Sequence, residues 1–266
     1  MAIKLLALDL DGTLLDDSQN ISQKNIDALR KAEEKGVNIV IATGRTNLGA
    51  EDIFRQLELK EFLIAYNGAL IKNMKENKVI KHLPLPMQQT HEILEYVKKE
   101  NLYVNLYLNN KVYANKAGKE LDYYKNIMNI EPSVLEEDTV EFLDKATTKL
   151  LIIEKDLFKV DQILYKLQDQ FAGELNIIKS IEDCIDIMNK NVSKGNSLED
   201  LTRMLGLKAE EVAAVGDGNN DLEMIKFAGK SAAVANAEEV IREKADYITA
   251  SNNEDGVAEF IEEFIL

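Results

Sequence analysis

Two aspartates separated by a single residue follow the first apolar run of the chain. Residues 3–8 predict a buried strand, and Asp9 and Asp11 stand at its end, before Gly12. Alternate residues of a strand point to the same side, so both carboxylates can converge where the chain turns. An aspartate can act as a nucleophile and form an aspartyl-phosphate, and a second carboxylate can protonate a leaving group and then activate water. The alternative is that the pair only caps the turn.

Two further segments could bind an anion. Thr43, Gly44 and Arg45 follow the apolar run 37–42, and a hydroxyl with free backbone N–H groups at a helix start attracts negative charge. A threonine that merely caps the helix is the simpler explanation. Lys194 opens a predicted helix, where its charge opposes the helix dipole unless an anionic partner lies close by. A solvated lysine is the alternative there.

Polar side chains also crowd the turn within residues 215–224, VGDGNNDLEM. Asp217, Asn219, Asn220 and Asp221 stand there within five positions. Hard cations take oxygen ligands, and clustered carboxylates repel one another unless a cation lies between them. One aspartate would suffice to cap the following helix, so four polar side chains exceed that need. The segment therefore predicts a metal site.

Alternating strand and helix patterns at both ends of the chain must position these residues. Apolar runs at 3–8, 37–42, 62–65, 212–215, 232–234 and 247–249 predict strands, and helical spacing separates them. This order predicts an α/β fold, a doubly wound and mostly parallel sheet with a Rossmann-like core. Ligands bind beyond the carboxyl ends of such strands. The segments at Asp9, Thr43 and Asp217, and Asn67-Gly68 after the third run, lie at strand ends.

The middle of the chain has a different pattern. Pro84 and Pro86 stand together, and residues 102–108 and 111–114, separated by two asparagines, predict a β-hairpin. We therefore expect an α/β core at 1–83 and 189–266, interrupted by an α+β domain at 84–188. Residues 83–87 and 188–193 are the expected hinges between them.

Charge and composition limit the classes of partner. The 266 residues carry a formal net charge of −15, which disfavours nucleic acid and anionic membranes. The sequence has no apolar run of about 18 residues that could span a membrane. The single cysteine, Cys184, favours a reducing cytoplasm. We expect a monomer or a weak homo-oligomer. An anionic substrate would need a local cation to overcome the overall charge.

The ordered motifs resemble those of the haloacid dehalogenase superfamily, in its phosphatase branch. The segment beginning at Asp9 is similar to the first motif, Thr43 in IATGR to the second, Lys194 in VSKG to the third, and residues 216–224 to the fourth. The position and length of the insert resemble those of the α/β cap of the Cof-like hydrolases. The segments AYNGA at 65–69 and NEDGVAEFI at 253–261 are also similar to that branch.

This resemblance implies a role for each motif residue. Asp9 would attack phosphorus and Asp11 would act as general acid and base, with Lys194 completing the catalytic set. The phosphoryl oxygens would be held by Thr43, Gly44, Lys194 and Asn220. Mg²⁺ would be bound by Asp9, the backbone carbonyl of Asp11, Asp217 and Asp221, the last directly or through Lys194 or a water. Arg45 and Asn67 are expected to make contacts near the site.

The expected function is a Mg²⁺-dependent phosphatase that hydrolyses a small phosphorylated metabolite, a sugar phosphate or a phosphorylated cofactor. A phosphomutase is the alternative among enzymes, since related proteins return the phosphoryl group to the substrate. A catalytically inactive, metal-binding regulatory protein on the same fold is the alternative outside enzymes.

Overall fold

The chain folds into two compact units. The computed structural model describes residues 2–57, 62–128, 130–136, 138–142 and 146–266. The first unit combines the two ends of the chain, Met1–Lys81 and Ser193–Leu266, and the second unit is His82–Val192. In the described part of the chain, no helix combines the length and apolarity needed to cross a membrane.

The first unit is built on an eight-stranded sheet with the order β14-β13-β12-β1-β2-β3-β4-β5. Neighbouring strands from β14 to β3 run parallel, and β4 runs antiparallel to β3. The predicted doubly wound, mostly parallel fold class is therefore confirmed. The strands are β1 (Leu5–Leu8), β2 (Asn38–Ala42), β3 (Phe62–Ala65), β4 (Leu70–Asn73), β5 (Lys78–His82), β12 (Val212–Gly216), β13 (Lys230–Val234) and β14 (Tyr247–Thr249).

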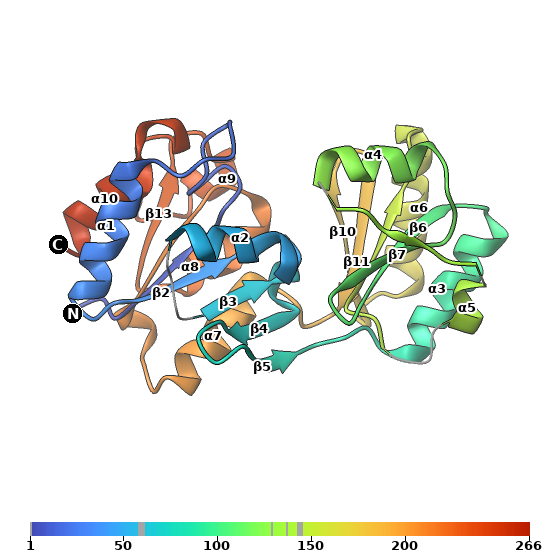
Figure 1. The fold of residues 1–266 in the computed structure, drawn as a ribbon, viewed down its shortest axis with the longest axis horizontal. Coiled ribbons are helices and arrows are strands. Elements are labelled where there is room, and N and C mark those ends of the chain that lie inside the picture. Colours follow the sequence, from blue (N-terminus) through green and yellow to red (C-terminus); the bar gives the residue numbers. More distant parts are fainter. Residues whose placement is uncertain (1, 58–61, 129, 137, 143–145) are drawn as a thin grey trace. The chain divides into compact units, whose positions relative to one another are not determined.

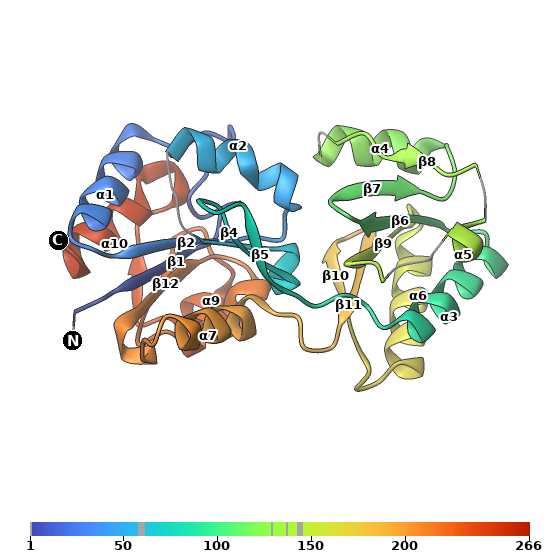
Figure 2. The same ribbon diagram turned by 60° about the horizontal axis from the view of Figure 1, so that its bottom comes forward.

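Helices cover both faces of this sheet. Figure 2 shows α1 and α2 on one face and α7 on the other; α10 packs against α1 and α8 against α7. Ser22 caps α1 by accepting from the N–H of Asn25, and Gly36, at φ 83°, ends it in a left-handed conformation. The helices are α1 (Gln23–Glu34), α2 (Asn47–Leu57), α7 (Lys194–Met204), α8 (Leu222–Phe227), α9 (Glu239–Arg242) and α10 (Gly256–Phe264).

Strand β1 lies between β12 and β2, and all four of its residues are buried. In the parallel register, Leu8 lies opposite Val215 of β12 and Ile41 of β2. The carboxyl ends of the three strands therefore meet at the same edge of the sheet. The residues that follow them, including Asp9, are brought side by side by backbone pairing alone.

The second unit has a six-stranded sheet with the order β10-β11-β9-β6-β7-β8 (Figure 1). The predicted hairpin is present as β6 and β7, and Asn109 and Asn110 both have positive φ, as tight hairpin turns require. Its strands are β6 (Tyr103–Leu108), β7 (Lys111–Ala114), β8 (Ser133–Val134), β9 (Lys149–Ile153), β10 (Leu175–Ile181) and β11 (Cys184–Asn189); its helices are α3 (Met87–Lys99), α4 (Lys119–Met128), α5 (Thr139–Phe142) and α6 (Leu157–Gln170).

One face of this second sheet forms an apolar core with α3 and α6. Leu106 of β6, Leu150 of β9 and Ile187 of β11 pack there against Leu94 of α3 and other buried aliphatic side chains. Burial at about 25 cal/mol per Å² of apolar surface stabilises this unit through its own core. The insert is therefore a folded domain of the α+β kind.

Candidate active site

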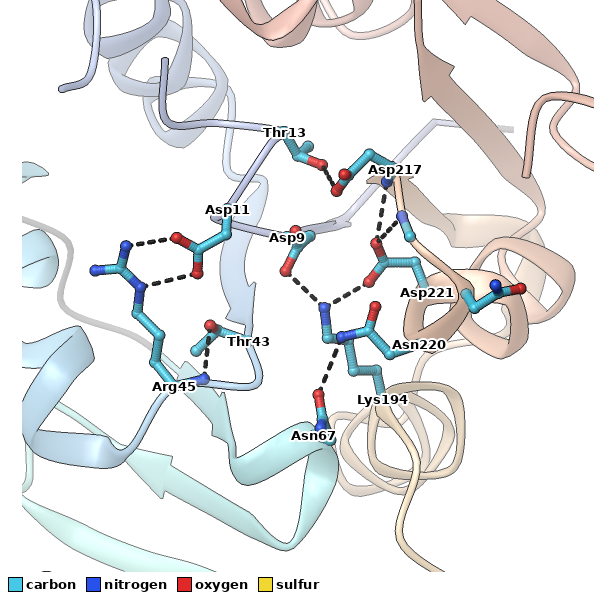
Figure 3. Close-up of polar contacts among 12 residues, drawn as sticks. Asp9, Asp11, Thr13, Thr43, Arg45, Asn67, Lys194, Asp217, Asn220 and Asp221 are labelled. Atoms are coloured by element: carbon cyan, nitrogen blue, oxygen red, sulfur yellow. Dashed lines mark hydrogen bonds and ion pairs between the residues drawn. The ribbon is translucent and has the colours of Figure 1, made fainter. Parts of the chain in front are cut away.

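Lys194 lies at the centre of the residues that the sheet edge brings together (Figure 3). Its Nζ donates to Oδ1 of Asp9 and to Oδ1 of Asp221, at 2.6 Å in each case, and its side chain has no exposed surface. The lysine is the first residue of α7, whose N-cap is Ser193. The two carboxylates are the anionic partners that offset its unfavourable place at a helix N-terminus.

Close packing of α7 against α8 sets the place of Lys194. A Cβ on Gly195 would lie only 2.5 Å from Cβ of Glu223, so a larger residue would push the two helices apart. Asp221 is fixed from its other side, because its Oδ2 accepts the backbone N–H groups of Asp217 at 3.0 Å and Gly218 at 3.1 Å. The Lys194–Asp221 pair is thus held on the lysine side by the packing of α7 against α8 and on the aspartate side by two backbone N–H groups.

Burial and charge perturb the acids around Lys194. Burial, the charge of Asp221 and that of Asp217 raise the pKa of Asp9 well above its usual range, although Lys194 opposes the rise. The pKa of Asp217 is raised by burial and by Asp221. Burial alone would lower the pKa of Lys194, but the carboxylates of Asp221 and Asp9 raise it above its usual value. Two of the three neighbouring carboxylates, those of Asp9 and Asp221, bond the ammonium group of Lys194.

The same three acids fit a divalent cation. Asp9, Asp217 and Asp221 each offer a carboxylate oxygen, and these oxygens lie within 4.8 Å of one another. Such all-oxygen sets suit hard cations. Burial first and then the neighbouring carboxylates raise the pKa of Asp9 and of Asp217, and a cation would relieve the repulsion among the carboxylates. Thr13, which the sequence interpretation missed, donates its hydroxyl to Oδ1 of Asp217 at 2.8 Å.

Asp11 faces a different partner from Asp9. Its carboxylate accepts two hydrogen bonds from Arg45, from Nε to Oδ2 at 2.8 Å and from Nη2 to Oδ1 at 2.5 Å. Its side chain is 47% exposed, whereas Asp9 is buried. The carboxylate of Asp11 is not in the three-acid group around Lys194. The structure therefore points the two side chains in different directions (Figure 3).

The turn at Thr43 differs from the predicted helix start. Thr43 is fully buried, and its Oγ1 accepts the N–H of Arg45 at 3.1 Å. Helix α2 begins only at Asn47, and it is Thr46 whose Oγ1 accepts the N–H of Gly49, at 2.9 Å. The interpretation of Thr43 as a helix cap was therefore wrong. The 43–45 turn stands before the helix because β2 ends at Ala42 and leaves a four-residue connection.

A second turn, Tyr66–Gly68, supports the first. Tyr66 and Asn67 both have positive φ, at 52° and 55°, and their N–H groups donate to the carbonyls of Arg45 and Thr43. Oδ1 of Asn67 accepts from Nδ2 of Asn220 at 3.0 Å and would lie 2.9 Å from a Cβ on Gly44. Left-handed conformations at non-glycine residues cost free energy and persist where the surrounding structure holds them.

Gly68 joins this turn to α7. Its carbonyl accepts from the hydroxyl of Ser197 at 2.7 Å, and a Cβ on Gly68 would lie 2.2 Å from the carbonyl oxygen of Ser193. The Asn67-Gly68 pair therefore contacts three of the predicted segments at once. The sequence predicted that Asn67-Gly68 follows a strand end. The contacts of the pair depend on packing that no local sequence pattern shows.

Comparison with known proteins finds a matching enzyme family and similar phosphatases. A family model described as haloacid dehalogenase-like hydrolase matches residues 6–261. Phosphatase YwpJ of Bacillus subtilis is 30% identical over 286 residues, covering 99% of this chain and 100% of the relative. In the same organism, the 5-amino-6-(5-phospho-D-ribitylamino)uracil phosphatase YcsE is 34% identical over 267 residues, covering 99% of this chain and 96% of the relative.

Solved structures of haloacid dehalogenase-like hydrolases have a similar fold. A haloacid dehalogenase-like hydrolase from Bacteroides thetaiotaomicron matches with a TM-score of 0.90 and 30% identity, covering 98% of this chain and 99% of that one. The chain belongs to the haloacid dehalogenase-like hydrolases. Within that family it is an enzyme of the phosphatase class, as its full-length phosphatase relatives indicate.

Proposed function

We propose that the protein is a Mg²⁺-dependent phosphatase that hydrolyses a small phosphorylated metabolite through an aspartyl-phosphate intermediate. The observation that carries the proposal is the buried Lys194 shared by Asp9 and Asp221 beside a three-carboxylate cluster. This arrangement combines a nucleophilic carboxylate with positive charge for phosphoryl oxygens, which is most of what phosphoryl transfer requires.

The metal would be held by the carboxylates of Asp9 and Asp217 and by the backbone carbonyl of Asp11, with Asp221 acting directly or through Lys194. When bound, Mg²⁺ would neutralise charge on the phosphoryl oxygens. Both oxygens of Asp221 already accept protein donors, which favours the role through Lys194.

Asp9 and Asp11 carry out the bond-making and proton-transfer steps. The carboxylate of Asp9 attacks phosphorus, the bond to the leaving oxygen breaks, and Asp11 gives that oxygen a proton. Asp11 then takes a proton from water as the water attacks phosphorus, which releases inorganic phosphate and restores Asp9. Lys194 favours the ionised form of Asp9 that attacks, because its charge lowers the pKa of that carboxyl.

Four groups are proposed to hold the phosphoryl oxygens: the hydroxyl of Thr43, the N–H of Gly44, the ammonium of Lys194 and the amide of Asn220. One amide hydrogen of Asn220 is used by Asn67, so the other would face the substrate. Of the two turn residues, Thr43 is buried and Gly44 half-buried, which gives their donors a fixed position.

The division of the chain supplies the rest of the proposal. We assign residues 1–83 and 189–266 to the catalytic core and residues 84–188 to a cap that selects the substrate. The phosphoribitylaminouracil phosphatase among the relatives supports a sugar phosphate or a phosphorylated cofactor as the substrate class. The single cysteine is buried and free, which supports a cytoplasmic enzyme, and we propose a monomer or a weak homo-oligomer.

A metabolite panel tests the function. The purified chain with Mg²⁺ should release inorganic phosphate from a subset of phosphorylated metabolites, and Asp9→Asn should release none. Asp27→Asn is the matched control, because Asp27 lies exposed on α1 and accepts a hydrogen bond from the neighbouring Gln23 side chain. No release from any metabolite, or equal release by Asp9→Asn, would refute the proposal. Accumulation of sugar-phosphate isomers without free phosphate would establish the phosphomutase instead.

A further inference from the structure

The guanidinium of Arg45 binds the carboxylate of Asp11 through two hydrogen bonds that form a fork. Nε donates to Oδ2 and Nη2 donates to Oδ1, so each carboxylate oxygen has its own donor. Bidentate pairs of this kind fix orientation as well as distance, because the planar donors match the planar carboxylate. Both residues of the pair lie within the first unit.

Arg45 is itself firmly placed. Its backbone N–H donates to Oγ1 of Thr43 at 3.1 Å, and its carbonyl accepts the N–H of Tyr66 at 3.0 Å. Its Nη2 also donates to Oε1 of Gln19. Backbone bonds on both sides and a second acceptor at the side-chain tip hold the guanidinium in one position. The side chain of Asp11, in contrast, is 47% exposed.

We propose that Arg45 is a positioning residue that holds the carboxylate of Asp11 where one of its oxygens can turn to the leaving oxygen of the substrate. This inference rests on the proposed function, in which Asp11 is the acid. Each oxygen of Asp11 accepts one hydrogen bond from Arg45 and keeps a second lone pair. That lone pair can carry the proton for the leaving oxygen while the bonds to Arg45 keep the carboxylate in place.

The proposal separates two kinds of substrate. The value of kcat/KM reports the steps up to departure of the leaving group. A 4-nitrophenolate group leaves without a proton, whereas an alkoxide needs one. If Arg45 acts only through Asp11, its loss must lower kcat/KM for alkyl phosphates and change it little for 4-nitrophenyl phosphate. If Arg45 held the phosphoryl group, both substrates would lose equally.

The test uses Arg45→Lys and Arg45→Met in the full chain with Mg²⁺. Each should lower kcat/KM for the best alkyl phosphate by about 10- to 100-fold, a fraction of what general acid catalysis contributes. Lysine should not rescue, because a single ammonium cannot form the fork. Inhibition by inorganic phosphate should keep the same Ki. Arg203→Met is the control for charge loss, since Arg203 is an exposed arginine of α7 that pairs with Glu199.

A double-mutant cycle closes the test. Asp11→Asn combined with Arg45→Met should lose no more activity on the alkyl phosphate than Asp11→Asn alone, because a positioning residue has no effect once its partner is removed. Additive losses, or equal losses on both substrates in the single variants, would overturn the inference while leaving the phosphatase intact. Absence of turnover by the unmodified chain on both substrates would instead refute the proposed function.

Discussion

Removal of the Lys194 ammonium should destabilise the first unit strongly, and a divalent cation should offset much of the loss. The substitution Lys194→Met keeps the length and apolar volume of the side chain but leaves Asp9 and Asp221 without their 2.6 Å partner. Neither the lysine nor Asp221 has any exposed side-chain surface, so water cannot replace the lost charge. With Asp217 nearby, three acids would then face one another without compensation.

The magnitude follows from the burial. Removing one partner of a buried ion pair costs about 3–5 kcal/mol. For a unit of this size, 1 kcal/mol shifts Tm by about 2–4 °C, so we expect a fall of about 6–20 °C in the absence of metal. The fall should be larger at high pH, because loss of Lys194 removes the charge that lowers the pKa of Asp9. Protonation at low pH relieves the repulsion.

Thermal unfolding of both forms, with EDTA or with saturating Mg²⁺, measures the effect. A ligand at 100 times its Kd contributes about 2.7 kcal/mol, and the more negative site of the variant should bind the cation more tightly than the wild type. Lys149→Met is the matched control. It breaks another buried lysine–aspartate pair, with Asp186 at 2.8 Å in the second unit, where the three acids are absent.

We therefore expect both lysine variants to lose stability and only Lys194→Met to gain more from Mg²⁺ than the wild type does. A Lys194→Met protein as stable as the wild type in EDTA would show that the carboxylates do not need the ammonium. An equal Mg²⁺ shift in all three proteins would show that the cation does not bind at the three acids.

Three further outcomes are expected. Asp9→Asn should abolish phosphate release while the protein remains folded by circular dichroism; retained turnover would exclude Asp9 as the nucleophile. The raised pKa of Asp9 means that ionisation of this carboxyl opposes folding. In EDTA, the Asp9→Asn protein should therefore gain stability relative to the wild type as pH rises from about 4 through the raised pKa. A difference in unfolding free energy that stays constant with pH in urea titrations would contradict this. Gly68→Ala should destabilise the protein by more than the roughly 1–3 kcal/mol of a strained left-handed residue, because its Cβ would lie 2.2 Å from the carbonyl oxygen of Ser193. Gly36→Ala is the control, since Gly36 has positive φ but open space around a Cβ, so it measures the conformational cost alone. Equal losses of stability in the two variants would refute the clash.

The sequence predicts the core elements of the fold well because most are apolar runs in a buried sheet. β1, β2 and β12 are buried almost throughout, so each reads as a continuous hydrophobic segment. β4 and β5 were missed, since Lys72, Lys78 and Lys81 interrupt their apolar pattern. α4 was missed as well, because only Leu121 and Tyr124 of its residues are buried and two positions give no clear helical period.

For the site, the identities of the residues could be predicted but not their pairings. Strand ends gave the locations of Asp9, Thr43 and Asp217, because the sheet edge is fixed by topology. The direction of each side chain depends on partners far away in the sequence. The fork between Asp11 and Arg45 spans 34 positions and the Lys194–Asp9 bond spans 185. Spacing along the chain carries no information about either.

The division of the chain into a first unit made of both ends and a second unit inserted between them has a consequence for inheritance. Every contact described around Lys194 joins residues of Met1–Lys81 and Ser193–Leu266. The second unit has its own apolar core. Substitutions within the insert therefore leave the bonds of the chemical centre untouched. If the second unit selects the substrate, as proposed, new specificities can arise there by mutation while the first unit passes on the reaction unchanged.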